Sequence, residues 1–229
     1  MYNSGSRGSP VSRVLIPIAA GFILGALLLW LALGLQSQQA LADIDNGVLI
    51  DPGHGGEDVG AIAPDSGVYE SELNLAVALA LKDALTEGGI KKVDLTRSDE
   101  NALGPTKDAD MQERARIISS TEAAIMVSIH MNSFPSDTAV KGPQVFYQTG
   151  DTTSMRLAQA IQHRLDAAAG TDRGIQQKDL FVLRNATVPA VLVECGFLTN
   201  PEEDKLLQQQ EYQRVIAGAI ADGIADYCG

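Results

Sequence analysis

Cysteine is scarce in this 229-residue chain, and basic residues are few relative to acidic ones. Cys195 and Cys228 are too few for a disulfide framework or for a zinc site built from clustered thiols. Seventeen lysines and arginines stand against 29 aspartates and glutamates, which gives a formal net charge of -12. Such a surface repels nucleic acid and anionic lipid, so we expect no nucleic-acid partner.

Charge is also missing from one long apolar run near the N-terminus. Residues 14–35 contain no charged side chain, and the preceding arm carries Arg7 and Arg13 but no acid. As a helix, 22 residues span about 33 Å, enough to cross a bilayer core of about 30 Å. We therefore predict one N-terminal hydrophobic helix that contacts the membrane, with the arginines left in the cytoplasm.

A cleaved signal is the alternative to this membrane anchor. The tripeptide Ala-Leu-Ala at residues 40–42 matches a signal peptidase site. Under either interpretation, residues 1–42 form an anchor or signal segment and residues 43–229 form one domain. Both interpretations make that domain extracytoplasmic, either membrane-anchored or secreted.

The rest of the chain alternates between strand-like and helix-like segments, which predicts an α/β fold with helices on both faces of the sheet. Asp151 and Asn200 are expected N-caps, and the last helix is expected to bury Val215. Strands are predicted near 48–50, 91–96, 123–129, 143–149, 180–183 and 190–195, and helices over 70–87, 107–119 and 212–227 and after the two caps.

The sequence VLIDPGHGGEDVG at residues 48–60 places one histidine, His54, in a glycine-rich loop at the end of a strand. Open α/β sheets bind ligands at the carboxyl ends of their strands. Together with Glu70 and His130, this histidine makes a set of two imidazoles and one carboxylate, typical of a catalytic zinc site with one open position. We therefore predict one zinc ion per chain. The loop lacks the features of a phosphate-binding P-loop.

Glu194 interrupts the apolar segment AVLVEC at residues 190–195. A carboxylate there is costly to bury without a partner, and burial raises its pKa, which suits a general acid and base. Each site residue also has an ordinary interpretation. Glu70 could favour a helix N-terminus, His130 could be a plain strand-end histidine, His54 could fill a loop, and Glu194 could pair with an arginine.

Several separated motifs in order resemble the zinc-dependent N-acetylmuramoyl-L-alanine amidases of the amidase 3 type. They are LIDPGHGG, YESELNLAVALAL, VDLTRSDE, ERARIIS, VSIHMNS and VPAVLVECGFLTNPEE, and the similarity covers residues 47–227. The resemblance implies a single α/β domain with a twisted, mostly parallel (mixed) sheet. It implies zinc ligands at His54, Glu70 and His130, a catalytic Glu194, and a substrate-groove position at Asn132.

The same resemblance implies peptidoglycan as substrate, cut between the lactyl group of N-acetylmuramic acid and L-alanine of the stem peptide. A short catalytic domain after an N-terminal anchor looks most like the spore-cortex (germination-specific) subgroup. Members of that subgroup remove stem peptides so that muramic δ-lactam can be made. Control by a protein activator is compatible with this resemblance. A zinc carboxypeptidase or deacetylase acting on the cell wall, or a non-catalytic wall-binding regulator, remain as alternatives.

Three arginines, Arg97, Arg114 and Arg184, are further candidates for binding stem-peptide carboxylates. Ion pairs within the fold explain each of them equally well at this stage.

Overall fold

The structure is a computed structural model that describes residue 44 and residues 46–229. The predicted hydrophobic helix at 14–35 and the signal peptidase site at 40–42 lie outside these residues. Within the described part of the chain, no helix has both the length and the apolar character needed to cross a membrane.

One six-stranded sheet forms the centre of the molecule, in the order β2-β1-β3-β6-β4-β5. Strands β2, β1, β3 and β6 are mutually parallel, whereas β4 pairs antiparallel with β6 and β5 pairs parallel with β4. The fold class predicted from the sequence is thereby confirmed. The strands are β1 (Val48–Pro52), β2 (Val93–Leu95), β3 (Ile125–Asn132), β4 (Gln144–Tyr147), β5 (Gln176–Gln177) and β6 (Ala190–Phe197).

Within the described residues, six helices connect and cover these strands, and the two predicted N-caps are confirmed. Asp151 accepts hydrogen bonds from Thr153 N and Ser154 N, and Asn200 accepts them from the second and third helical residues, after a proline at the first. The helices are α2 (Glu70–Glu87), α3 (Lys107–Ser119), α4 (Thr152–Ala169), α5 (Phe181–Arg184), α6 (Pro201–Leu207) and α7 (Gln210–Cys228).

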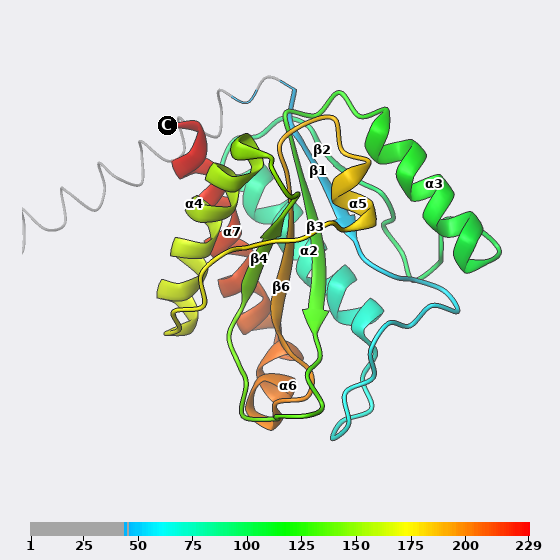
Figure 1. The fold of residues 1–229 in the computed structure, drawn as a ribbon, viewed down its shortest axis with the longest axis vertical. Coiled ribbons are helices and arrows are strands. Elements are labelled where there is room, and N and C mark those ends of the chain that lie inside the picture. The colour runs from blue at the N-terminus through cyan, green and yellow to red at the C-terminus, as the bar shows by residue number, and fades with distance from the viewer. Residues whose placement is uncertain (1–43, 45) are drawn as a thin grey trace, which may run out of the picture.

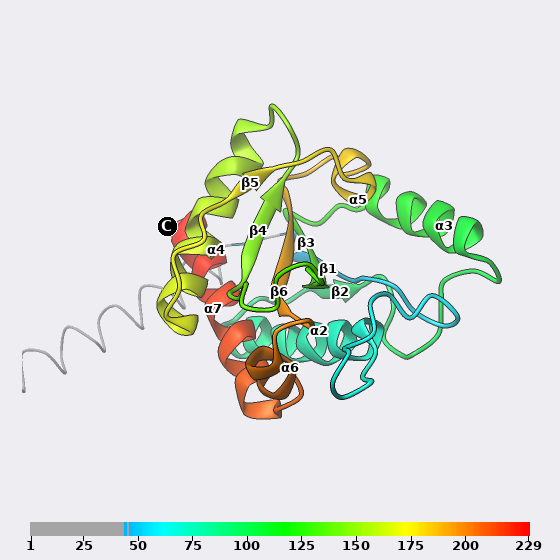
Figure 2. The same ribbon diagram turned by 60° about the horizontal axis from the view of Figure 1, so that its bottom comes forward.

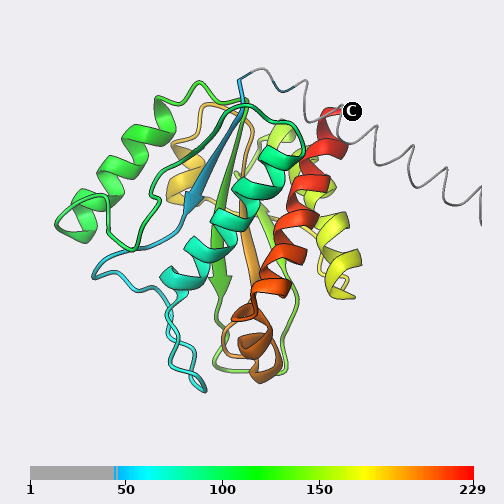
Figure 3. The same ribbon diagram turned by 180° about the vertical axis from the view of Figure 1, so that it is seen from behind.

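The helices lie on both faces of the sheet. Helices α2, α4 and α7 line up side by side over one face, which Figure 3 shows from behind. Helices α3 and α5 lie on the other face, beside the upper part of the strands in Figure 1. The larger apolar cluster fills the first interface, and a smaller cluster around Met126, Phe146 and Leu192 lies beneath α5. The lower, carboxyl ends of β3 and β6 extend beyond α5 (Figures 1 and 2).

Two local predictions are wrong. Residues 180–183 were expected to form a strand, but residues 181–184 form the short helix α5, and the strand β5 lies earlier, at 176–177. The apolar side chains Val182 and Leu183 are buried as neighbours under a helical turn, which a short apolar run alone does not distinguish from a strand. Val215 was expected in the core but is 45% exposed, because the buried stripe of α7 runs through Ile216 and Ile220 instead.

Candidate active site

The histidine loop begins directly at the carboxyl end of β1. His54 has a φ of 61°, the one non-glycine residue with positive φ in the described chain. A side chain in this region costs energy and is retained where the surrounding contacts enforce it, often at functional sites. Gly53 provides the space, because a Cβ there would lie 2.2 Å from the imidazole of His130. The loop is therefore shaped to bring two imidazoles together.

The buried guanidinium of Arg97 fixes this loop by hydrogen bonds to backbone carbonyls. Its Nε donates to Pro52 O at 3.1 Å, and its Nη2 donates to Gly53 O and to Ser71 O, both at 2.9 Å. These bonds tie the loop to the start of α2. Arg97 is thus occupied by backbone carbonyls, and the expectation that it binds a substrate carboxylate is replaced by a structural role.

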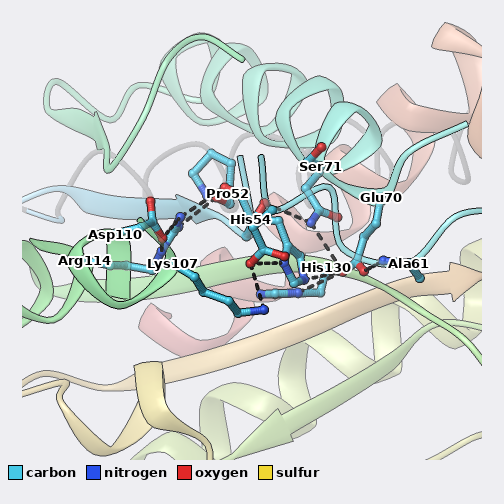
Figure 4. Close-up of polar contacts among 12 residues, drawn as sticks. Pro52, His54, Ala61, Glu70, Ser71, Lys107, Asp110, Arg114 and His130 are labelled. Carbon is cyan, nitrogen blue, oxygen red and sulfur yellow. Dashed lines mark hydrogen bonds and ion pairs between the residues drawn. The ribbon is translucent and has the colours of Figure 1, made fainter. Parts of the chain in front are cut away.

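Arg114, from α3, completes the support with only 2% of its side chain exposed. It donates to Pro52 O at 2.9 Å and to His54 O at 3.0 Å, and it pairs with Asp51 at 2.5 Å and with Asp110 at 3.2 Å. Burial alone would raise the pKa of Asp51, but the guanidinium and two hydroxyl donors hold it below its usual range. Arg114 therefore fixes the backbone of the histidine it contacts (Figure 4).

Three side chains predicted as metal ligands converge at one point in front of this loop (Figure 4). Oε1 of Glu70 lies 3.3 Å from His54 Nε2 and 2.9 Å from His130 Nδ1. The two imidazole rings meet edge to face with centroids 5.0 Å apart. All three ligand atoms lie within 4.8 Å of one another, a group that could hold a metal ion.

Glu70 is itself held in place by its neighbours at the first turn of α2. Its Oε2 accepts a hydrogen bond from Ala61 N at 2.8 Å, and its Oε1 accepts weaker ones from Met131 N at 3.3 Å and Asn74 Nδ2 at 3.4 Å. Asn74 also donates to Gly53 O at 3.1 Å. The carboxylate is therefore fixed before any ligand binds.

Asp58 contacts the predicted ligand His54, and the sequence interpretation did not single it out. Its Oδ2 lies 3.0 Å from His54 Nδ1 and 3.1 Å from the ammonium of Lys107. An acceptor at Nδ1 selects the tautomer in which Nε2 carries the lone pair, and Nε2 is the nitrogen that faces Glu70. The spacing of four residues between His54 and Asp58 was visible in the sequence, but a tight loop was needed to bring them together.

Glu194 enters from the neighbouring strand β6. It stands directly opposite His130 in the parallel pairing of β3 with β6, so the two side chains share one face of the sheet. Cys195, the next residue, points the other way into the core and is fully buried. One carboxylate oxygen of Glu194, Oε2, is buried and has no hydrogen-bond partner among the described residues. A buried polar atom without a protein partner is available to bind a ligand or water.

Comparison with known proteins places this arrangement in a family. The family model described as N-acetylmuramoyl-L-alanine amidase matches residues 48–226. This range includes the three predicted metal ligands and Glu194. The chain belongs to this amidase family. The resemblance inferred from the motifs and the enzyme class it implied are confirmed.

Two relatives from Bacillus subtilis (strain 168) illustrate the amidase similarity. An uncharacterized protein, YqiI, is 38% identical over 183 residues, covering 79% of this chain and 84% of that protein. The germination-specific N-acetylmuramoyl-L-alanine amidase is 33% identical over 190 residues, covering 79% of this chain and 78% of that one.

A solved amidase structure matches the fold as well. The CwlD amidase from Clostridioides difficile, determined in complex with the GerS lipoprotein, superposes with a TM-score of 0.74 at 35% identity. The match covers 80% of this chain and 98% of that chain.

The pKa values of the two carboxyl groups in this amidase site are shifted in opposite directions. Burial alone would raise the pKa of Glu70, but the adjacent imidazoles of His130 and His54 hold it below its usual range. Burial raises the pKa of Glu194 to about 7, although the nearby His130 opposes the shift. Two acids whose pKa values are pushed apart are suited to different tasks, one as a permanent anion and one as a group that exchanges protons.

The three converging atoms fit a tetrahedral cation in kind and in spacing. Bonds of about 2.0–2.2 Å to a tetrahedral zinc place ligand atoms about 3.3–3.6 Å apart. The separations from Glu70 Oε1, 2.9 Å to His130 Nδ1 and 3.3 Å to His54 Nε2, are close to that range, and all three atoms lie within 4.8 Å of one another. The orphaned Oε2 of Glu194 marks where a further polar group belongs.

The remaining candidates lie elsewhere or play smaller parts in this amidase. Asn132 ends β3, half-buried, on the same face as His130, and its Oδ1 accepts a hydrogen bond from Ser133 N at 2.8 Å. Arg184 forms an exposed ion pair with Asp179 at 2.9 Å. The fold thus brings the predicted ligands and Glu194 to one edge of the sheet and leaves Arg184 in a surface pair.

Proposed function

We propose that this protein is a zinc-dependent peptidoglycan amidase in which His54, Glu70 and His130 hold one zinc ion. The reaction is hydrolysis of the amide between the lactyl group of N-acetylmuramic acid and L-alanine. The observation that carries this proposal is the convergence of two imidazoles and an anionic carboxylate beside a second, unpartnered carboxylate. Family membership supports the same substrate.

The metal ligands and Glu194 have different roles in amide hydrolysis. His54, Glu70 and His130 would hold a zinc ion, which would act as a Lewis acid toward the scissile carbonyl and would lower the pKa of a water. Glu194 takes a proton from the attacking water at Oε2 and returns it to the leaving amine of L-alanine. A pKa of about 7 suits this exchange, because the group is then a competent base and a competent acid at neutral pH.

Other residues hold these groups in position. Asp58 keeps the Nδ1 proton of His54, and Arg97 and Arg114 hold the loop backbone on which that histidine stands. We assign substrate contact to Asn132, two residues beyond His130 on the same face. With its Oδ1 taken by Ser133, its Nδ2 hydrogens are the groups available to an acceptor of the substrate.

Spore-cortex maturation is the role that fits the relatives best. Similarity to a germination-specific amidase supports it, and so does similarity to a structure complexed with a lipoprotein. We infer that residues 1–42 anchor or export residues 43–229, so that the domain acts outside the cytoplasmic membrane. A protein activator outside the membrane, of the lipoprotein kind, is the corresponding partner. Deletion of the gene should remove muramic δ-lactam from the cortex in a spore-forming host.

Digestion of purified peptidoglycan tests the activity. The amidase creates free L-alanine amino termini and leaves the glycan strands intact. Release of terminal amino acids would indicate a carboxypeptidase, and release of acetate a deacetylase. If Glu194→Gln had unchanged activity in cells, the protein would instead be a non-catalytic binding module on an amidase scaffold.

A further inference from the structure

The segment at residues 171–180 passes along β4 on its way to α5 (Figure 1). Backbone pairing fixes this segment, since Lys178 N donates to Tyr147 O at 2.9 Å and β5 pairs with β4. Its short strand leaves most side chains exposed. The segment therefore forms a fixed border on the β4 side of the site.

Side chains from three adjacent strands share the face that carries Glu194. His130 of β3 and Gln144 of β4 stand opposite Glu194 on either side. Phe146, two residues beyond Gln144, lies on the same face because side chains alternate along a strand. Anything seated above Phe146 is thus on the same surface as the reacting groups.

Arg173 links the segment at residues 171–180 to the sheet face that carries Glu194. Its Nη2 donates to Gln144 Oε1 at 3.0 Å, and its guanidinium lies 4.9 Å from the ring centroid of Phe197. Gln144 returns a hydrogen bond from Nε2 to Gly174 O at 3.2 Å. Since Gln144 is the register partner of Glu194, the segment is held at the level of the catalytic carboxylate.

Lys178 is the cation that this arrangement leaves available. Its ammonium lies 5.5 Å from the ring centroid of Phe146, and its side chain is otherwise exposed. Asp179, its neighbour, is engaged by Arg184 at 2.9 Å. No carboxylate of the described residues lies within 4 Å of Lys178, although seven other lysines and arginines form such pairs.

We propose that Lys178 forms a subsite for a free carboxylate of the stem peptide, next to the scissile amide. The inference rests on the proposed amidase function. A chain with a net charge of -12 repels an anionic peptide, so a local cation is needed to recognise one. The peptide continues from L-alanine into residues that carry carboxylates. The ammonium lies over Phe146, which pairs with Leu192, two residues before Glu194 on the same face, so it can accept such a group a fixed distance along the strands from the reacting bond.

The test compares two muropeptides that differ only in whether the α-carboxylate of the second stem residue is free or amidated. With wild-type protein, the free carboxylate should give the lower KM. Lys178→Met should raise KM for the free form about tenfold, the loss of one charge-assisted contact, with kcat little changed. KM for the amidated form should stay the same, and Lys178→Arg should restore the preference.

Lys92→Met is the matched control, since Lys92 precedes the opposite edge strand β2 and is 51% exposed. It should leave both KM values unchanged. Equal effects of Lys178→Met on both muropeptides, or no effect on either, would overturn the subsite while leaving the amidase intact. Failure of the wild-type protein to release L-alanine amino termini from either muropeptide would instead overturn the proposed function on which the subsite rests.

Discussion

Replacing Arg114 by methionine isolates the ion pair that supports the histidine loop. Methionine fills much of the same space but leaves Asp51 buried, at 0% exposure, without its guanidinium partner. The hydroxyls of Thr96 and Ser128 still donate to that carboxylate, at 2.7 and 2.8 Å. Breaking one side of a buried pair costs about 3–5 kcal/mol. Because a domain is stable by about 5–15 kcal/mol in all, this loss should be plain in the free energy of unfolding.

The loss of unfolding free energy caused by Arg114→Met should depend on pH. In the wild-type protein the pKa of Asp51 is lowered, so its contribution is present above the unfolded value near 3.8 and is lost as pH falls through the folded value. Without Arg114, burial is opposed only by the hydroxyl donors of Thr96 and Ser128, so we expect the folded pKa of Asp51 to rise above the unfolded one. The destabilisation by Arg114→Met should therefore be largest at neutral pH and should shrink as pH falls and the carboxyl is protonated.

Urea unfolding of four proteins, measured at pH 7 and pH 5, makes the comparison. They are the wild type, Arg114→Met, Asp51→Asn and the double variant. Because Asp51→Asn removes the buried charge, the double variant should be more stable than the sum of single losses predicts, by about 1–3 kcal/mol. The reasoning that the Arg114–Asp51 pair stabilises the histidine loop would be refuted by either of two results. One is additive losses of unfolding free energy, and the other is a cost for Arg114→Met below about 1 kcal/mol.

Four further predictions concern the site. Glu194→Gln should lower kcat on peptidoglycan by about 10²–10⁴-fold while zinc content by metal analysis stays near one per chain, whereas His54→Ala should lose both. Asp58→Asn should weaken zinc binding, measured by chelator competition, by about 10–100-fold, because Nδ1 of His54 loses its carboxylate. Gly53→Ala should lower zinc affinity sharply, since its Cβ would lie 2.2 Å from the His130 ring. Chelator treatment should abolish hydrolysis, and added zinc should restore it; activity that persists without metal would contradict the zinc assignment.

Much of the fold could be predicted from local patterns. The helix at Glu70–Glu87 begins and ends where the periodicity and the Gly88-Gly89 stop place it, and the caps at Asp151 and Asn200 hold. Residues 176–184 could not be predicted, because a short apolar run fits a strand and a helical turn equally well. Their conformation depends on pairing with β4, a contact made only in the folded sheet.

By itself, the sequence determined which chemical groups were available and that each stood at the end of a strand or the start of a helix. Those are local properties, set by glycine, proline and the alternation of apolar residues. Only the tertiary structure decided how they combine. The order of strands sets β3 beside β6 and so places Glu194 opposite His130. It also turns Arg97 and Arg114 from candidate substrate ligands into supports for the loop, because their guanidinium groups are buried against carbonyls far away in the chain.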